Sequence, residues 1–131
     1  MSPDDVRRWA AQYKAAWESA DSQAVASLFA DDGTYRDNIY EEPHRGRSGV
    51  IGYWEGVTAP QSEVTVTMGD PYVDGQRAVV EFWTNMHIAD NPVTLAGALL
   101  LEFNDDGMCR SLREYWNFID GTHQPPEGWG S

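Results

Sequence analysis

The stretch Phe29-Ala-Asp-Asp-Gly-Thr-Tyr-Arg-Asp-Asn-Ile-Tyr-Glu-Glu-Pro-His-Arg-Gly46 divides the chain into a helical first part and a second part rich in strand patterns. Within it, Asp31-Asp32-Gly33 predicts the turn that ends a short helix, and residues 34–37 predict a short strand. The polar residues 38–45 predict a loop. Because helices precede a run of strands instead of alternating with them, the sequence predicts an α+β fold.

Three helices are predicted around this stretch. The first begins at Ser2, which can cap a helix, with Pro3 at the first helical position. Its apolar residues recur at helical spacing and therefore lie on one face: Val6, Trp9, Ala10, Tyr13, Ala16, Trp17 and Ala20. A second, short helix starts at residue 21 and includes Phe29, and a third covers about residues 47–57.

The second half of the chain predicts an antiparallel meander. Four strand patterns lie near residues 63–72, 77–87, 93–104 and 108–119, with turn residues between them. The tail, residues 121–131, contains Pro125-Pro126 and is expected to lack regular structure, either mobile or lying across a pocket mouth. At 131 residues the chain is long enough for one domain, and we expect residues 1–131 to form it.

Composition excludes several classes of function. The formal net charge of -12 opposes binding to nucleic acid and to anionic membrane surfaces. No apolar stretch approaches the roughly 20 residues that span a bilayer, and the chain opens without a basic and then apolar leader, so we expect a cytoplasmic protein. The single cysteine, Cys109, cannot form an internal disulfide. Because His44, His87 and His123 are not spaced as a ligand cluster, no metal site is expected.

Strand alternation identifies an unusual carboxyl group. In the second long strand, one face is mainly apolar and holds Val80, Phe82, Thr84 and Met86. In the last strand, Glu114 shares a face with Leu112, Trp116 and Phe118 and is the only ionisable residue on it. Loss of hydration there would raise the pKa of Glu114 and make it a candidate proton donor near neutral pH. The alternative is that Glu114 pairs with an arginine or caps a backbone amide.

Four segments resemble one known superfamily: residues 28–37, Glu42-Pro43 with Gly46, the helix segment 50–54, and Arg113-Glu-Tyr-Trp116. They resemble the NTF2-like superfamily, and within it the ketosteroid-isomerase-like and SnoaL-like proteins. The resemblance implies an α+β cone, in which three N-terminal helices pack on a curved antiparallel sheet that encloses an apolar pocket. The same cone hosts isomerases, dehydratases, cyclases, epoxide hydrolases and non-catalytic proteins, so it implies a fold and not one activity.

The resemblance also implies roles for individual residues. Asp37 matches the catalytic base of the ketosteroid isomerases, and Tyr13 matches the tyrosine that donates a hydrogen bond to the developing oxyanion. Leu99 stands where those isomerases carry a protonated aspartic acid, and leucine cannot donate a hydrogen bond. Losing one such donor typically costs about 100-fold to 1000-fold in rate. Glu114 is a candidate replacement.

These roles have plainer alternatives. Asp37 can be a turn or cap carboxylate, and Tyr13 a core aromatic. A further set of residues would line the pocket if the geometry of the superfamily holds, although each is equally explained as core: Trp17, Phe29, Tyr53, Trp54, Phe82, Met86, Leu99, Leu101, Leu112 and Trp116. The excess of aromatic residues favours a cavity for a small, apolar, ring-containing ligand.

Two classes of function remain open. The first is a cofactor-independent acid/base enzyme, namely an isomerase, a dehydratase or an aldol-type cyclase, acting on a small apolar carbonyl or polyketide-like compound. The second is a protein that binds a small molecule without converting it. A third class, epoxide hydrolysis, resembles another branch of the superfamily and would need an Asp-Arg-Asp relay inside the cavity. Because Arg113 is predicted to point away from the face of Glu114, no such relay is expected.

Two further expectations come from the resemblance. His44 could reach the pocket entrance as a proton carrier, as in dehydratases of the superfamily. Family members commonly pair through the outer surface of the sheet, where Trp83, Glu81 and Tyr115 are expected, so we predict a homodimer.

Overall fold

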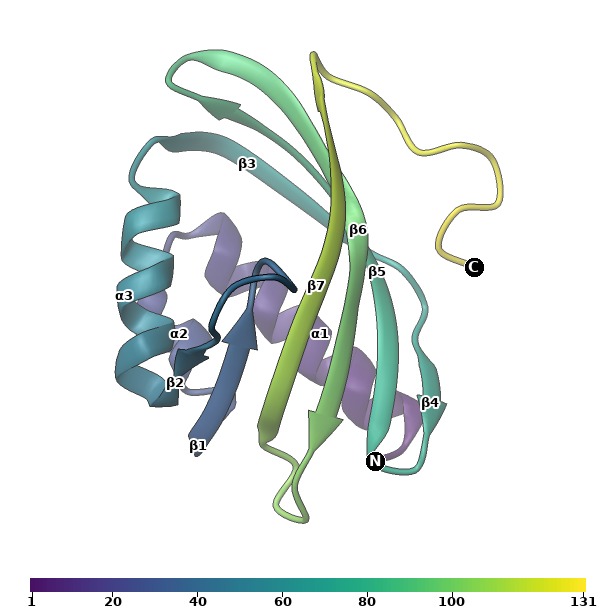
Figure 1. The fold of residues 1–131 in the computed structure, drawn as a ribbon. Coiled ribbons are helices and arrows are strands. Elements are labelled where there is room, and N and C mark those ends of the chain that lie inside the picture. Colours follow the sequence, from purple (N-terminus) through teal and green to yellow (C-terminus); the bar gives the residue numbers. More distant parts are fainter.

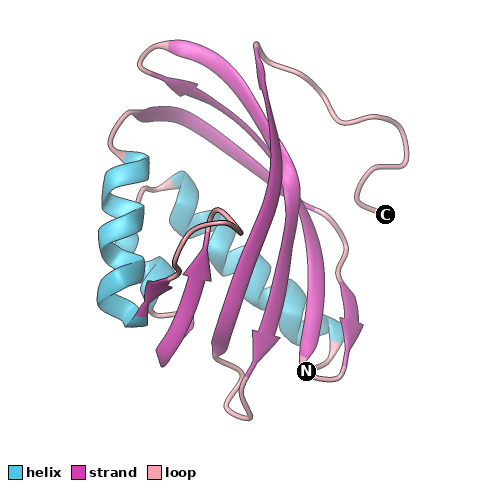
Figure 2. Cartoon of the chain, in the orientation of Figure 1, coloured by secondary structure: helices cyan, strands magenta, loops and turns pink.

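A strongly curved sheet wraps around three helices in the computed structural model, which describes all 131 residues (Figures 1 and 2). The helices are α1 (Pro3–Glu18), α2 (Ser22–Ala26) and α3 (Gly46–Thr58). The strands are β1 (Phe29–Arg36), β2 (His44–Arg45), β3 (Gln61–Met68), β4 (Tyr72–Asp74), β5 (Arg77–Ile88), β6 (Asn91–Phe103) and β7 (Cys109–Asp120). The strand order is β2-β1-β7-β6-β5-β3, with β4 paired to β5. The predicted α+β cone is confirmed.

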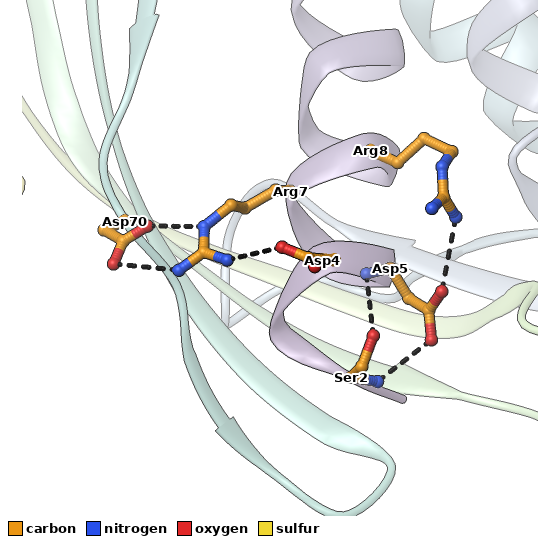
Figure 3. A network of polar contacts seen from close by, with 6 residues as sticks. All are labelled: Ser2, Asp4, Asp5, Arg7, Arg8 and Asp70. Carbon is orange, nitrogen blue, oxygen red and sulfur yellow. Dashed lines mark hydrogen bonds and ion pairs between the residues drawn. The ribbon is translucent and has the colours of Figure 1, made fainter.

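Helix α1 begins where the sequence predicts it. The Ser2 hydroxyl accepts a hydrogen bond from the Asp5 amide at 3.1 Å, and the Asp5 carboxylate accepts one from the Ser2 amide at 3.0 Å (Figure 3). This capping box satisfies two amide groups at the helix start. Arg7 joins the helix to the segment between β3 and β4 through two hydrogen bonds to Asp70, of 2.7 and 3.3 Å (Figure 3). The apolar face of α1 packs in the hydrophobic core between the helices and the sheet.

Aromatic rings fill much of the core between the helices and the sheet. Six of the seven residues predicted on the apolar face of α1 are buried, namely Val6, Trp9, Ala10, Tyr13, Ala16 and Trp17. The seventh, Ala20, is exposed because the helix ends at Glu18. The ring of Tyr13 stacks on Trp9 at 5.3 Å and meets Trp54 of α3 edge-on at 5.6 Å. Close packing of such large side chains supplies much of the apolar burial that stabilises a domain of this size.

The segment around Asp31-Asp32-Gly33 differs from the prediction. Phe29 lies in β1, not in the second helix, and Asp31-Asp32-Gly33 continues that strand instead of forming a turn. Strand β1 pairs in parallel with β7, and the register shifts between Phe29 and Thr34. A Cβ on Gly33 would lie 3.0 Å from the Cys109 carbonyl oxygen, so the close approach of β1 to β7 depends on glycine there. The turn residues thus produce an irregularity within a strand.

The two faces of the sheet have different neighbours. The inner face, which is turned toward the helices, includes the predicted buried set Val80, Phe82, Thr84 and Met86. The outer face carries the tail, residues 121–131 (Figure 1). There the Trp83 indole donates to the His123 carbonyl at 2.9 Å, and the Trp129 ring meets Trp83 edge-on at 5.8 Å. None of the helices has the length and apolar character needed to cross a membrane.

Candidate active site

Asp37 lies directly after β1 and beside His44. Strand β2 returns along β1 with Tyr35 opposite His44, which brings the imidazole to the carboxyl group. The His44 Nε2 atom is 2.9 Å from Asp37 Oδ1, and both side chains are partly exposed. The Trp116 indole donates to the Asp37 carbonyl oxygen at 2.9 Å, so β7 also fixes this backbone. Asp37 is therefore an anchored carboxyl group that solvent and a ligand can reach.

Glu114 faces the same region from β7. The Tyr35 hydroxyl donates to Glu114 Oε2 at 2.8 Å. Burial raises the pKa of Glu114 to about 8, against the opposing effect of the Tyr35 hydrogen bond, and the negative charge of Asp37 raises it further. A neutral carboxylic acid and a nearby carboxylate are the two states that acid/base catalysis requires.

Tyr13 lies behind this pair and not in it. It is fully buried, and its hydroxyl is 3.0 Å from the Tyr35 hydroxyl. Because Tyr35 donates to Glu114, the Tyr35 oxygen is left to accept from Tyr13. Burial raises the pKa of both phenols, and the charge of Glu114 raises it further, so both stay protonated. The three residues form a directed hydrogen-bond chain that ends on Glu114.

Tyr53 supplies an unused hydroxyl at the site. It lies on α3, with its ring centroid 4.6 Å from that of His44 and 5.0 Å from that of Tyr35. Its hydroxyl has no hydrogen-bond partner within the chain. Burial raises the pKa of Tyr53, and the negative charges of Glu114 and Asp37 raise it further. Sequence analysis gave Tyr53 only as a lining residue and did not single out Tyr35.

The register of β6 and β7 places Glu114 next to Leu99. The two residues are directly opposite each other. Side chains in such a pair have Cβ atoms about 4.5–5.5 Å apart and share one face of the sheet. The carboxyl group of Glu114 therefore lies beside the side chain of Leu99, which cannot donate a hydrogen bond.

Most of the predicted lining residues belong to the core. Eight of the ten are buried: Trp17, Phe29, Trp54, Phe82, Met86, Leu99, Leu101 and Leu112. Tyr53 is half-buried, and Trp116 is 47% exposed. The accessible part of the site consists of Asp37, His44, Tyr53, Glu114 and Trp116. Beside it lie the exposed side chains of Phe118, Ile39 and Tyr40.

The histidines are distributed over three separate places. His44 is at the site, His87 lies 3.2 Å from Glu63, and His123 is in the tail. No three His, Cys, Asp or Glu side chains come together in a way that could bind a metal ion.

Comparison with known families identifies the chain. Residues 6–111 match the model of the SnoaL-like domain. The chain belongs to the SnoaL-like domain family. No curated protein matches it in sequence.

Solved structures similar to this SnoaL-like domain share its cone. One is a hypothetical protein with a ketosteroid isomerase-like fold from Catenulispora acidiphila, solved in complex with trimethylamine. It is 28% identical in sequence, with a TM-score of 0.74, and the match covers 82% of this chain and 83% of that one. The epoxide hydrolase/cyclase-like enzyme SalBIII, described in pyran ring formation in the polyether salinomycin, has 20% identity, a TM-score of 0.73 and coverage of 85% and 89%. RV0760c from Mycobacterium tuberculosis has 15% identity, a TM-score of 0.78 and coverage of 92% and 99%.

Proposed function

We propose that this SnoaL-like domain is a cofactor-independent acid/base enzyme, an isomerase, dehydratase or aldol-type cyclase, acting on a small apolar carbonyl or polyketide-like compound. The observation that carries the proposal is that Glu114, whose pKa is raised to about 8 by burial and by the negative charge of Asp37, lies in the same region as that partly exposed carboxyl group. Two carboxyl groups held in different protonation states near neutral pH are typical of proton-transfer sites.

Asp37 acts as the base in this proposal. His44 holds Oδ1 of Asp37, which leaves Oδ2 to take a proton from the carbon next to a substrate carbonyl. The same carboxyl group, now protonated, returns the proton at another position of the substrate in an isomerisation. The Trp116 hydrogen bond to the Asp37 backbone keeps the base in place.

Glu114 and Tyr53 stabilise the oxyanion that develops. The neutral Glu114 donates from the oxygen that does not accept from Tyr35, and the unpartnered Tyr53 hydroxyl donates beside it. Tyr13 and Tyr35 are positioning residues, because their chain fixes one oxygen of Glu114 and does not reach the substrate. Glu114, paired in register with Leu99, supplies the second donor that leucine cannot.

The surroundings favour a flat, apolar substrate that contains a ring. Trp116 and Phe118 lie on the same face of β7 as Glu114 and are 47% and 50% exposed, so a ring can stack on them beside the carboxyl pair. The Catenulispora acidiphila structure holds a small molecule, and SalBIII is described in ring formation, which agrees with a small-molecule role for this site.

We also propose that the protein is a homodimer that associates through the outer face of β7. Tyr115 and Ile119 are 43% and 53% exposed there, whereas the tail covers part of Trp83. Light scattering after size-exclusion chromatography is expected to show a dimer, and Ile119→Glu is expected to convert it to a monomer. A monomeric parent protein would refute this arrangement.

The main test is turnover of cyclic β,γ-unsaturated and β-hydroxy ketones, followed by ultraviolet absorbance of the conjugated product. The parent protein is expected to convert at least one of them, and Asp37→Asn is expected to keep its affinity and lose conversion. If Asp37→Asn still converts the ketone, the base is assigned wrongly. If the parent protein binds ketones tightly without converting any, the second candidate, a non-catalytic binding protein, replaces the first.

A further inference from the structure

A second binding feature lies on the outer face of the sheet, away from the carboxyl pair. The register aligns one residue from each of five neighbouring strands in a single row: Tyr72 of β4, Val79 of β5, Leu100 of β6, Arg113 of β7 and Arg36 of β1. The row is aromatic at one end, aliphatic in the middle and cationic at the other end. Neighbouring strands are about 4.8 Å apart, so Tyr72 and Arg113 are separated by about 14 Å.

A groove of about 340 Å³ follows most of this row. Tyr72, Val79, Leu100 and Arg113 all line it. Tyr72 is 64% exposed, and Val79 and Leu100 are only partly covered. The groove therefore offers apolar surface that a ligand could remove from water.

The cationic end of the groove has no partner in the protein. The chain has 21 acidic residues, yet neither Arg113 nor Arg36 forms an ion pair, and Arg36 donates only to the Glu41 carbonyl oxygen. Most other basic residues, such as Arg7 and Arg47, do pair with carboxylates. A guanidinium group that lies beside apolar surface and has free N–H donors is well suited to a carboxylate.

Negative groups also line the groove, in the adjacent row. Asp74 and Glu102 lie there on either side of Arg77, and Asp74 is 3.0 Å from the Arg77 guanidinium. Glu102 is not within ion-pair distance of Arg113. These carboxylates would repel a ligand that carries negative charge along its whole length. A ligand with a single acidic group can instead place that group at Arg113, which has no ion-pair partner.

We propose that this groove binds an apolar molecule with one acidic head group, such as a medium-chain aliphatic or an aromatic carboxylic acid. The apolar part lies on Leu100 and Val79 with its end at Tyr72, and the carboxylate lies on the Arg113 guanidinium. The site is separate from the acid/base site, because Arg113 and Glu114 are consecutive residues of β7 and point to opposite faces of the sheet.

The proposal is tested by titrating octanoate into the isotope-labelled protein and recording amide NMR spectra. We expect the signals of Tyr72, Val79, Leu100 and Arg113 to shift together. Arg113→Gln is expected to weaken octanoate binding by about tenfold or more, because a hydrogen-bonded charge is lost. Octanamide has the same chain without the charge, so its affinity for the parent protein should be no higher than the affinity of the variant for octanoate. Tyr72→Ala, at an exposed position, is expected to weaken binding by a smaller factor.

Arg110→Gln is the matched control. Arg110 is on the same strand, carries the same charge and forms no ion pair, but it lies outside the groove. This variant is expected to bind octanoate as the parent does. Equal weakening by Arg110→Gln, unchanged binding to Arg113→Gln, or shifts centred on Asp37 and Trp116 would each overturn the proposal. It would also be overturned if the signals of Tyr72, Val79 and Leu100 shifted with protein concentration alone, since the groove itself, and not the neighbouring dimer face at Tyr115 and Ile119, would then be an interface between copies of the chain.

Discussion

The two halves of β7 belong to one strand and have different surroundings. Residues 109–113 pair with β1 on one edge and β6 on the other, whereas residues 114–120 pair only with β6. On the inner face, Leu112 of the first half is fully buried, while Trp116 and Phe118 of the second half are 47% and 50% exposed. Glu114 is the first inner-face residue past the boundary. It is buried enough for its pKa to rise and still close to accessible surface, so the end of the paired region determines the surroundings of this carboxyl group.

The largest expected effect tests the buried half. Leu112→Ala should lower the free energy of unfolding by about 2–5 kcal/mol, because it removes a fully buried side chain from a packed core. Phe118 lies on the same face of β7, six residues further along the strand. Phe118→Ala should change the free energy of unfolding by about 0.5 kcal/mol or less. Urea denaturation of both variants gives the comparison. Similar losses at the two positions would mean that the exposed half is as structural as the buried half.

The next prediction concerns the boundary itself. Glu114→Gln should lower turnover by about 100-fold to 1000-fold, because the amide cannot replace the acid as a matched proton donor and oxyanion partner. The same variant should stay folded, as judged by circular dichroism at pH 6. If turnover falls only in proportion to a loss of folded protein, Glu114 is a structural residue.

Stability should depend on pH through the same residue. The pKa of Glu114 is raised from 4.5 to about 8 in the folded protein, so the unfolded chain releases this proton at lower pH than the folded one. The contribution of Glu114 to stability is therefore complete below about pH 4.5 and falls as the pH rises to about 8. Unfolding free energies measured across this range should decline less steeply in Glu114→Gln, and Phe118→Ala should keep the slope of the parent. Parallel curves for Glu114→Gln and the parent would contradict the raised pKa.

A direct check is an NMR titration of the Glu114 side-chain carboxyl in the parent protein. A midpoint near that of an exposed glutamate would remove the acid from the proposed mechanism, whatever the kinetics of the variants.

The smallest expected effect concerns the contact between the exposed half and the base. Trp116→Phe keeps an aromatic ring but removes the hydrogen bond to the Asp37 carbonyl oxygen, and should cost about 1 kcal/mol of unfolding free energy. Turnover should fall more in this variant than in Tyr115→Phe, which changes the neighbouring residue on the outer face. Equal kinetics for the two variants would separate Trp116 from the positioning of Asp37.

The sequence was sufficient for the parts of the fold that depend on periodicity. The buried face of α1 and the inward set of β5 both follow from spacing alone, because burial repeats with the backbone period. The pairing of β1 with β7 could not be predicted, because Asp31-Asp32-Gly33 is a turn signal by composition and becomes part of a strand only through the parallel pairing of β1 with β7.

The candidate site was predictable in its ionisable residues and not in their contacts. Glu114 was recognisable as an isolated charge on an apolar face. Its partner Tyr35 lies 79 residues away and has no local signal, and the approach of His44 to Asp37 depends on the path of a loop. Buried core and pocket lining have the same apolar composition, so the sequence could not tell which of the ten lining residues would be accessible.

The hydrogen bond from Trp116 to the backbone of Asp37 has a consequence for regiochemistry. In the proposed mechanism, a substrate ring stacked on Trp116 would be held at a set offset from the Asp37 carboxyl group, because the Trp116 indole also holds the Asp37 backbone. The distance between the stacked ring and the reacting carbon would then select which of several inequivalent carbons loses its hydrogen. Homologous substrates that differ only in the spacer between ring and carbonyl should therefore give different positional products.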